Sequence, residues 1–217
     1  MSSQPVARAA IIDYGGVMAV SPIGRIHMLA DHLGLSRDVV VDTIFGGHGD
    51  GSDNPYHDAE AGRGGLDDEF GQRMQARFDP HGVQFDLAWF VRWIIDAVNE
   101  PQPEFVKIVR RARESGIATL LLTNSVDGFF PVIEATIPVS DLFDHVLESW
   151  QIGSRKPEAR AYGLAAETLG VAPAECVFAD DLAVNVEAAE ALGMTGIHVT
   201  DATMGAHALA AALGLKS

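Results

Sequence analysis

Charged and hydroxyl side chains recur in this sequence at the points where short apolar runs end. Asp13 ends one such run, Thr123 ends a second, and Asp180 with Asp181 ends a third. Lys156 precedes a proline at the expected start of a helix and adds a positive charge. Carboxylates are the hard oxygen ligands that Mg²⁺ prefers, and a lysine can hold a phosphoryl oxygen. These residue types indicate metal-assisted phosphoryl chemistry, with Asp13 as metal ligand and candidate nucleophile.

The residues beside these groups extend the candidate site. Tyr14, Gly15 and Gly16 offer backbone N–H groups to further phosphoryl oxygens, and the glycines let the backbone close around a phosphate and a metal. For Asn124 and Asp181 the sequence allows both a functional and a purely structural role. Asn124 either contacts the substrate or only holds its turn. Asp181 either supports the metal or caps the helix that follows.

Alternating apolar elements must position these groups. Short β-branched runs predict five strands, at residues 7–13, 117–123, 145–148, 176–180 and 195–199. Apolar residues at helical spacing predict helices at 104–115, 158–169 and 183–192, each followed closely or ended by a glycine. Strand–helix alternation predicts an α/β fold, a three-layer Rossmann-like parallel sheet. In such a sheet the carboxyl ends of the strands share one edge, where ligands bind.

The interval 22–102 interrupts this alternation. It contains helical patterns at 24–33, 37–45, 67–78 and 86–98, a glycine- and histidine-rich stretch at 46–55, and no convincing strand. We therefore expect an inserted all-α cap at 22–102, on a core formed by 1–21 and 103–217.

Composition limits the possible partners. The 217 residues carry a net charge of −15, which argues against nucleic acid and against an anionic membrane surface. No run approaches the roughly 20 apolar residues of a membrane span, and no signal peptide is evident. The lone cysteine, Cys176, lies in an apolar run and is expected in the core. We expect a cytoplasmic protein.

At this point the sequence resembles a known family, the haloacid dehalogenase-like (HAD) hydrolases, which are mostly phosphatases. Its four motifs are matched in order by IIDYGGVM from Ile11, LLTNS from Leu121, GSRKP from Gly153 and FADDLAVNVEAAEALGM from Phe178. The resemblance covers most of the chain, and one subgroup of the family has a helical cap inserted after the first motif.

The resemblance implies a role for each matched residue. Asp13 would be the nucleophile, and Thr123 and Lys156 would bind phosphate. Asp180 would be a metal ligand with Asp181 in support, and Asn185 would brace their loop.

One position departs from the family pattern. Most phosphatases of the family have a second aspartate two residues after the nucleophile, as general acid and base, and here that position is Gly15. The family binds Mg²⁺ there through the backbone carbonyl, which glycine retains. General acid–base catalysis contributes about 10²–10⁴-fold. Aryl, acyl or anomeric sugar phosphates, whose leaving groups depart without a proton, should be affected least.

The sequence therefore predicts an Mg²⁺-dependent phosphatase that acts on a small phosphorylated metabolite through an aspartyl-phosphate on Asp13. The alternative is a non-catalytic or weakly active relative that binds a phosphorylated ligand or a partner protein. A dehalogenase is a more distant third possibility, because the acids and Lys156 match the phosphatase arrangement. The substrate and the oligomeric state are not predicted.

A few residues outside the motifs have weaker functional interpretations. Trp150 and Arg25 are considered for the cleft, whereas Trp89 and Trp93 are assigned to the core. A metal site on the cap loop is considered less plausible than an ordinary polar loop; its candidate ligands are His48, Asp50, Asp53 and His57.

Overall fold

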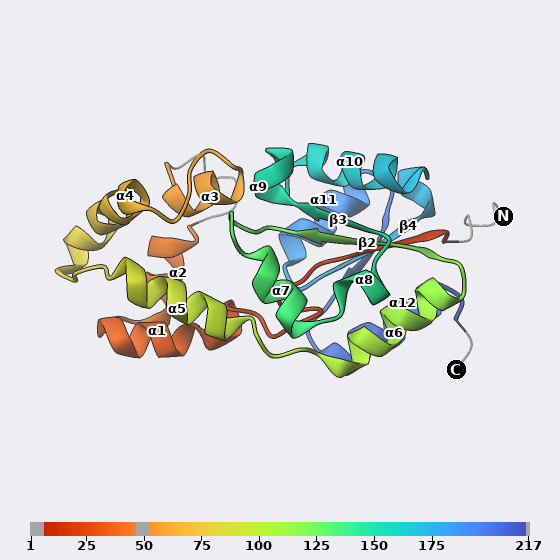
Figure 1. Cartoon of the computed structure of the whole chain (residues 1–217), viewed down its shortest axis with the longest axis horizontal. Coiled ribbons are helices and arrows are strands. Elements are labelled where there is room, and N and C mark those ends of the chain that lie inside the picture. Colours follow the sequence, from red (N-terminus) through yellow and green to blue (C-terminus); the bar gives the residue numbers. More distant parts are fainter. Residues whose placement is uncertain (1–6, 47–52, 216–217) are drawn as a thin grey trace.

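A single parallel sheet organises the computed structural model, which describes residues 7–46 and 53–215 (Figure 1). The sheet has five strands in the order β3-β2-β1-β4-β5. Their bounds are β1 Ala9–Ile12, β2 Ala118–Thr123, β3 His145–Glu148, β4 Cys176–Asp180 and β5 Thr195–His198. All five predicted strands are present, although β1, β2 and β5 are shorter than expected.

Both faces of the sheet are buried, as the apolar strand sequences require. In β1, Ala10 and Ile12 belong to one hydrophobic core, while Ala9 and Ile11 belong to a second core on the opposite face. The register pairs Ile12 with Ala179 of β4 and with Leu121 of β2. The residues that follow these strands therefore emerge at one edge.

Helices cover the two faces and complete the predicted three layers. One face carries α6 Pro103–Glu114, α7 Phe130–Thr136, α8 Val139–Leu142 and α12 Ala202–Ala212. The other carries α9 Ser149–Ile152, α10 Ala159–Leu169 and α11 Ala183–Ala191. The sequence predicted α6, α10 and α11 but not α7, α8, α9 or α12.

A separate group of helices lies beyond the carboxyl ends of the strands (Figure 1). It comprises α1 Ile26–Leu33, α2 Arg37–Ile44, α3 Pro55–Glu60, α4 Asp68–Phe78 and α5 Leu87–Ala97. These helices surround a hydrophobic cluster of their own. Ser36, Asp67 and Asp86 cap α2, α4 and α5 by accepting a hydrogen bond from a backbone N–H three residues later. We propose that this group is the inserted cap, with the boundaries at 22 and 102.

The cap differs from expectation at two points. Helix α3 was not predicted; it begins with Pro55, and its N-cap Asn54 accepts a hydrogen bond from the Tyr56 N–H at 2.8 Å. Trp93 is buried in the cap core, but Trp89 is only half-buried and stacks on His32 with ring centroids 3.7 Å apart. Within the described residues, no helix is long and apolar enough to cross a membrane.

Candidate active site

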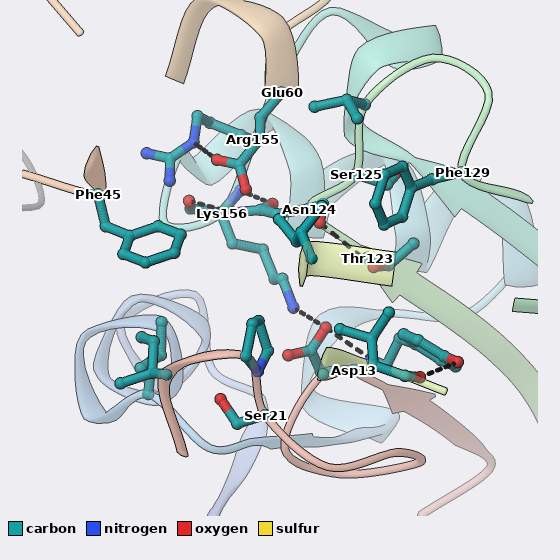
Figure 2. A pocket seen from close by; sticks show the side chains of 18 of the residues that line it. Asp13, Ser21, Phe45, Glu60, Thr123, Asn124, Ser125, Phe129, Arg155 and Lys156 are labelled. Carbon is teal, nitrogen blue, oxygen red and sulfur yellow. Dashed lines mark hydrogen bonds and ion pairs between the residues drawn. The ribbon is translucent and has the colours of Figure 1, made fainter. Parts of the chain in front are cut away.

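A buried lysine and two buried carboxylates form the floor of the site, at the carboxyl edge of the sheet. Figure 2 shows the lysine, Lys156, pointing to one of them, Asp13. Lys156 Nζ lies 2.7 Å from Asp13 Oδ1 and 2.6 Å from Asp180 Oδ2. Asp13 directly follows β1, Asp180 ends β4, and Lys156 follows α9. Lys156 is 1% exposed and Asp180 is fully buried, so this charge cluster is withdrawn from bulk water.

Burial and neighbouring charges set the protonation of this cluster. Burial raises the pKa of Asp13 well above its usual value, with the Lys156 ammonium opposing it. Burial would lower the pKa of Lys156, but Asp13 and Asp180 outweigh it and raise that pKa. Burial and the charge of Asp180 raise the pKa of Asp181 to about 6. Three acids thus face one lysine, so the positive charge of Lys156 does not balance them when all three are ionised.

The donor set fits a metal ion. Asp13, Asp180 and Asp181 each offer a carboxylate oxygen, and these oxygens lie within 4.8 Å of one another. All are hard ligands of the kind that Mg²⁺ binds. Asn185 donates from Nδ2 to Asp180 Oδ1 at 2.9 Å, while its own buried Oδ1 has no hydrogen-bond partner among the described residues. Asn185 thus braces the acidic loop, and the site retains an unsatisfied oxygen beside the acids.

The glycine loop after Asp13 has a different use from the one expected for Gly16. Gly16 has φ +83°, and a Cβ at this position would overlap the Asp181 carboxylate. Its N–H donates to the Ala19 carbonyl at 2.7 Å, so that donor is already occupied. The Tyr14 N–H likewise donates to Asp13 Oδ1 at 2.7 Å. The absent side chain of Gly16 therefore provides the space for Asp181, while Tyr14 and Gly15 line the cleft.

Asn124 holds the loop that carries Lys156. Its Nδ2 donates to the Lys156 carbonyl at 3.0 Å, and its Oδ1 accepts from the Lys156 N–H at 2.8 Å. Asn124 thus has a positional role, and because it also lines the cleft, its contact with the substrate stays a prediction. Thr123 is 4% exposed and lines the cleft beside it.

A second buried ion pair, absent from the predicted site, lies above this floor (Figure 2). Arg155 donates from Nε to Glu60 Oε2 at 2.8 Å, and both residues line the cleft. Burial raises the pKa of Glu60, and Arg155 opposes that shift. Arg155 lies beside Lys156 within a recognised motif, which was a usable signal. Glu60 lies on α3, which the sequence did not predict, so its contribution could not be foreseen.

Of the remaining candidates, only His57 lines the cleft among the residues that the structure describes. Arg25 donates to the Asp96 carbonyl at 2.9 Å and does not line the cleft, nor does Trp150. Of the possible cap-loop ligands, Asp53 pairs with Arg73 and His57 lines the cleft. The other two, His48 and Asp50, lie outside the described residues.

Comparisons with known proteins agree with this fold. The family model for haloacid dehalogenase-like hydrolases matches residues 8–193. The structure superposes with a TM-score of 0.64 on a HAD family enzyme from Bacteroides thetaiotaomicron, in complex with magnesium and inorganic phosphate. The two share 18% identity, and the match covers 88% of this chain and 93% of that one, which shows a common fold.

Three curated relatives have phosphatase names. A sesquiterpene phosphatase of Aspergillus oryzae is 33% identical over 46% of this chain and 52% of its own length. A phosphatase of Mycobacterium tuberculosis is 39% identical over 42% of this chain and 43% of its own. A fructose-1-phosphate phosphatase of Escherichia coli is 29% identical over 58% and 65%. The chain thus spans about half the length of the first two relatives.

The family match covers most of the chain, and the acid–lysine cluster lies where the four motifs predicted it. The chain belongs to the haloacid dehalogenase-like hydrolases. The predicted family and fold class are therefore confirmed.

Proposed function

We propose that the protein is an Mg²⁺-dependent phosphatase that hydrolyses a small phosphorylated metabolite through an aspartyl-phosphate on Asp13. One observation carries this proposal. Lys156 Nζ contacts Asp13 and Asp180 at once, and Asp181 offers a third oxygen within 4.8 Å of theirs. A nucleophile, a phosphate-binding cation and a metal donor set thus share one buried point. The phosphatase names of the relatives support the same reaction.

The chain's own residues account for the chemistry as follows. An Asp13 carboxylate oxygen forms a bond to phosphorus as the ester oxygen leaves, and water then hydrolyses the acyl phosphate to release phosphate. Lys156 and Thr123 hold the phosphoryl oxygens. Asp13, Asp180, Asp181 and the Gly15 carbonyl would hold Mg²⁺, which supplies positive charge to the phosphoryl group. Because Gly15 has no carboxyl, the leaving oxygen takes its proton from water.

A phosphate-release assay with acetyl phosphate, with and without Mg²⁺, tests this function. Asp13→Asn should abolish turnover, whereas Asp86→Asn, which retains a helix cap, should leave it unchanged. Metal chelation should stop the wild-type enzyme. Activity that survives both chelation and the Asp13 substitution would overturn the mechanism.

The missing general acid keeps the non-catalytic alternative in view. A protein of that kind would bind a phosphorylated ligand at the same cluster without releasing phosphate. Calorimetric binding of a phosphate ester, with no Asp13-dependent turnover of any ester in the same sample, would favour it over the enzyme.

A further inference from the structure

The cleft above the charged floor has an apolar wall. The empty space in and at the mouth of this cleft is about 910 Å³, part of which is open to solvent. Eight of its lining residues have aliphatic or phenyl side chains: Ile23, Phe45, Ile94, Val98, Val126, Phe129, Ile133 and Leu182. Six of the eight belong to or directly adjoin η1 Ile23–Arg25, α2, α5 and α7. When Lys156 binds the phosphate group of a substrate, the rest of that substrate would extend from the floor and contact this wall.

Packing fixes the wall in place. Figure 2 shows Phe45 and Phe129 on opposite sides of the Lys156 side chain, which points down to Asp13. The Phe45 ring meets Tyr56 edge-on with centroids 5.1 Å apart, and the Val98 carbonyl accepts a hydrogen bond from the Tyr14 hydroxyl at 2.8 Å. These contacts hold wall residues in position before an apolar group of the substrate binds.

The cations that line this cleft are already balanced. Arg155 is paired with Glu60, and Lys156 with Asp13 and Asp180. A second anionic group on the substrate would have to displace Glu60 from a buried guanidinium, which leaves a buried charge unpaired. Sugar hydroxyls against the apolar wall would lose their hydrogen bonds to water without replacement.

The names of the relatives differ in the polarity of the substrate: one is a sesquiterpene phosphatase and another a fructose-1-phosphate phosphatase. The cleft has polar lining residues such as Ser21 and Ser125, but its apolar wall favours the first of these two chemistries in the present chain. We propose that the substrate is a phosphate monoester of an apolar alcohol or phenol, with a single anionic group, whose hydrocarbon part packs between Phe45 and Phe129. This inference rests on the phosphatase function proposed above.

A series of 4-n-alkylphenyl phosphates, from methyl to pentyl, tests the inference. The leaving phenol is chemically almost constant along the series, so rate differences report contact with the wall. Each added methylene that is buried should raise kcat/KM by about fourfold until the cleft is filled. Glucose 6-phosphate and fructose 1,6-bisphosphate should be much poorer substrates than the pentyl ester.

Two variants test whether this wall causes the rise of kcat/KM with alkyl chain length, called the chain-length gradient below. Phe45→Gln and Phe129→Gln should each reduce the ratio of pentyl to methyl kcat/KM. Met28→Gln is the matched control, because Met28 is 50% exposed on α1 and does not line this cleft. It should keep the full gradient.

The outcomes separate the inference from the function on which it rests. Asp13-dependent hydrolysis of acetyl phosphate with a flat alkyl series, or with faster turnover of the sugar phosphates, overturns the inference and leaves the function standing. If no ester is hydrolysed, the proposed function fails. The substrate inference then fails with it, and calorimetric binding of 4-n-alkylphenyl phosphonates shows only whether the wall binds apolar ligands, by an affinity that rises with chain length.

Discussion

Gly16 and Asp181 show how one absent side chain makes room for another residue of the site. A Cβ at Gly16 would overlap the Asp181 carboxylate, and the φ of +83° is one that L side chains rarely adopt. Gly15, immediately before it, has neither constraint. Its backbone is not left-handed, and a Cβ there would make only an ordinary contact, 3.5 Å from Pro22 Cδ. The two adjacent glycines therefore differ in what they can tolerate.

Gly16→Ala should displace Asp181 and lower kcat by about 100-fold, which is the typical cost of misplacing an active-site group by about 1 Å. Gly34→Ala is the control, because Gly34 has a similar φ of +67° and no atom near the added Cβ. Both variants should lose about 1–3 kcal/mol of unfolding free energy through backbone strain. Equal loss of activity in the two would show that strain, rather than contact with Asp181, is responsible.

Gly15→Asp should restore a general acid and raise kcat for an alkyl phosphate by about 10²-fold, the lower end of what such catalysis contributes. An aryl phosphate should gain much less, because its phenolate leaves without a proton. Steady-state rates with a matched alkyl and aryl pair test the difference. An equal gain for both substrates would refute the assignment of the missing acid to this position.

At the scale of elements, a buried ion pair joins the cap to the core. Glu60 on α3 accepts from Arg155, 95 residues later in the loop after α9, and each residue is less than one-tenth exposed. A second close contact lies beside it, because Gly62, just after α3, passes so close to the Trp150 carbonyl that a Cβ would overlap it. The α3 region thus packs tightly against α9 and the loop between α9 and Lys156.

Arg155→Met should lower the free energy of unfolding at neutral pH by about 3 kcal/mol, since it leaves a buried carboxylate without its partner. Burial already places the pKa of Glu60 above 4.5, and loss of Arg155 should raise it further. The folded protein then holds this proton more tightly than the unfolded chain does. Stability should therefore be retained below about pH 4.5 and fall as pH rises through the folded-state pKa.

Denaturant titrations between pH 4.5 and 8 would measure this slope. The double variant Glu60→Gln/Arg155→Met lacks the ionisable group and should lose the additional pH dependence. If the single and double variants share one pH profile, Glu60 is not the group responsible.

At the scale of the whole molecule, the acidic balance and the site reinforce each other. The chain has a net charge of −15, and three acids converge at the point where the strands end. A cation that binds there offsets local repulsion in the folded state only. Folding and metal binding are expected to be linked for this reason.

Mg²⁺ at about 100 times its Kd should raise the free energy of unfolding by about 2.7 kcal/mol. Asp181→Asn should reduce this effect, while Asp86→Asn in the cap should retain it. Thermal melts with Mg²⁺ or chelator, at matched ionic strength, would measure the shift. An equal shift in Asp181→Asn would place the stabilising ion elsewhere on the acidic surface.

Local patterns determined much of the core by themselves. Runs of β-branched residues predicted all five strands, and glycines marked the ends of helices such as α10. Because parallel strands end at a common edge, the convergence of Asp13, Lys156 and Asp180 followed from the predicted parallel sheet. The catalytic and metal roles of these residues remain predictions that the proposed assays address.

Other features were decided only by tertiary structure. The pairing of Glu60 with Arg155 and the apolar wall beside Phe45 and Phe129 depend on where the cap lies. The space that Gly16 leaves for Asp181 depends on how two loops of the core meet. Each joins residues far apart in the chain, and no periodicity records which distant side chains will meet. The sequence determined the elements and the edge that carries the chemistry, because those depend on neighbours in the chain. The shape and polarity of the cleft depend on packing between elements, and only the folded molecule establishes that packing.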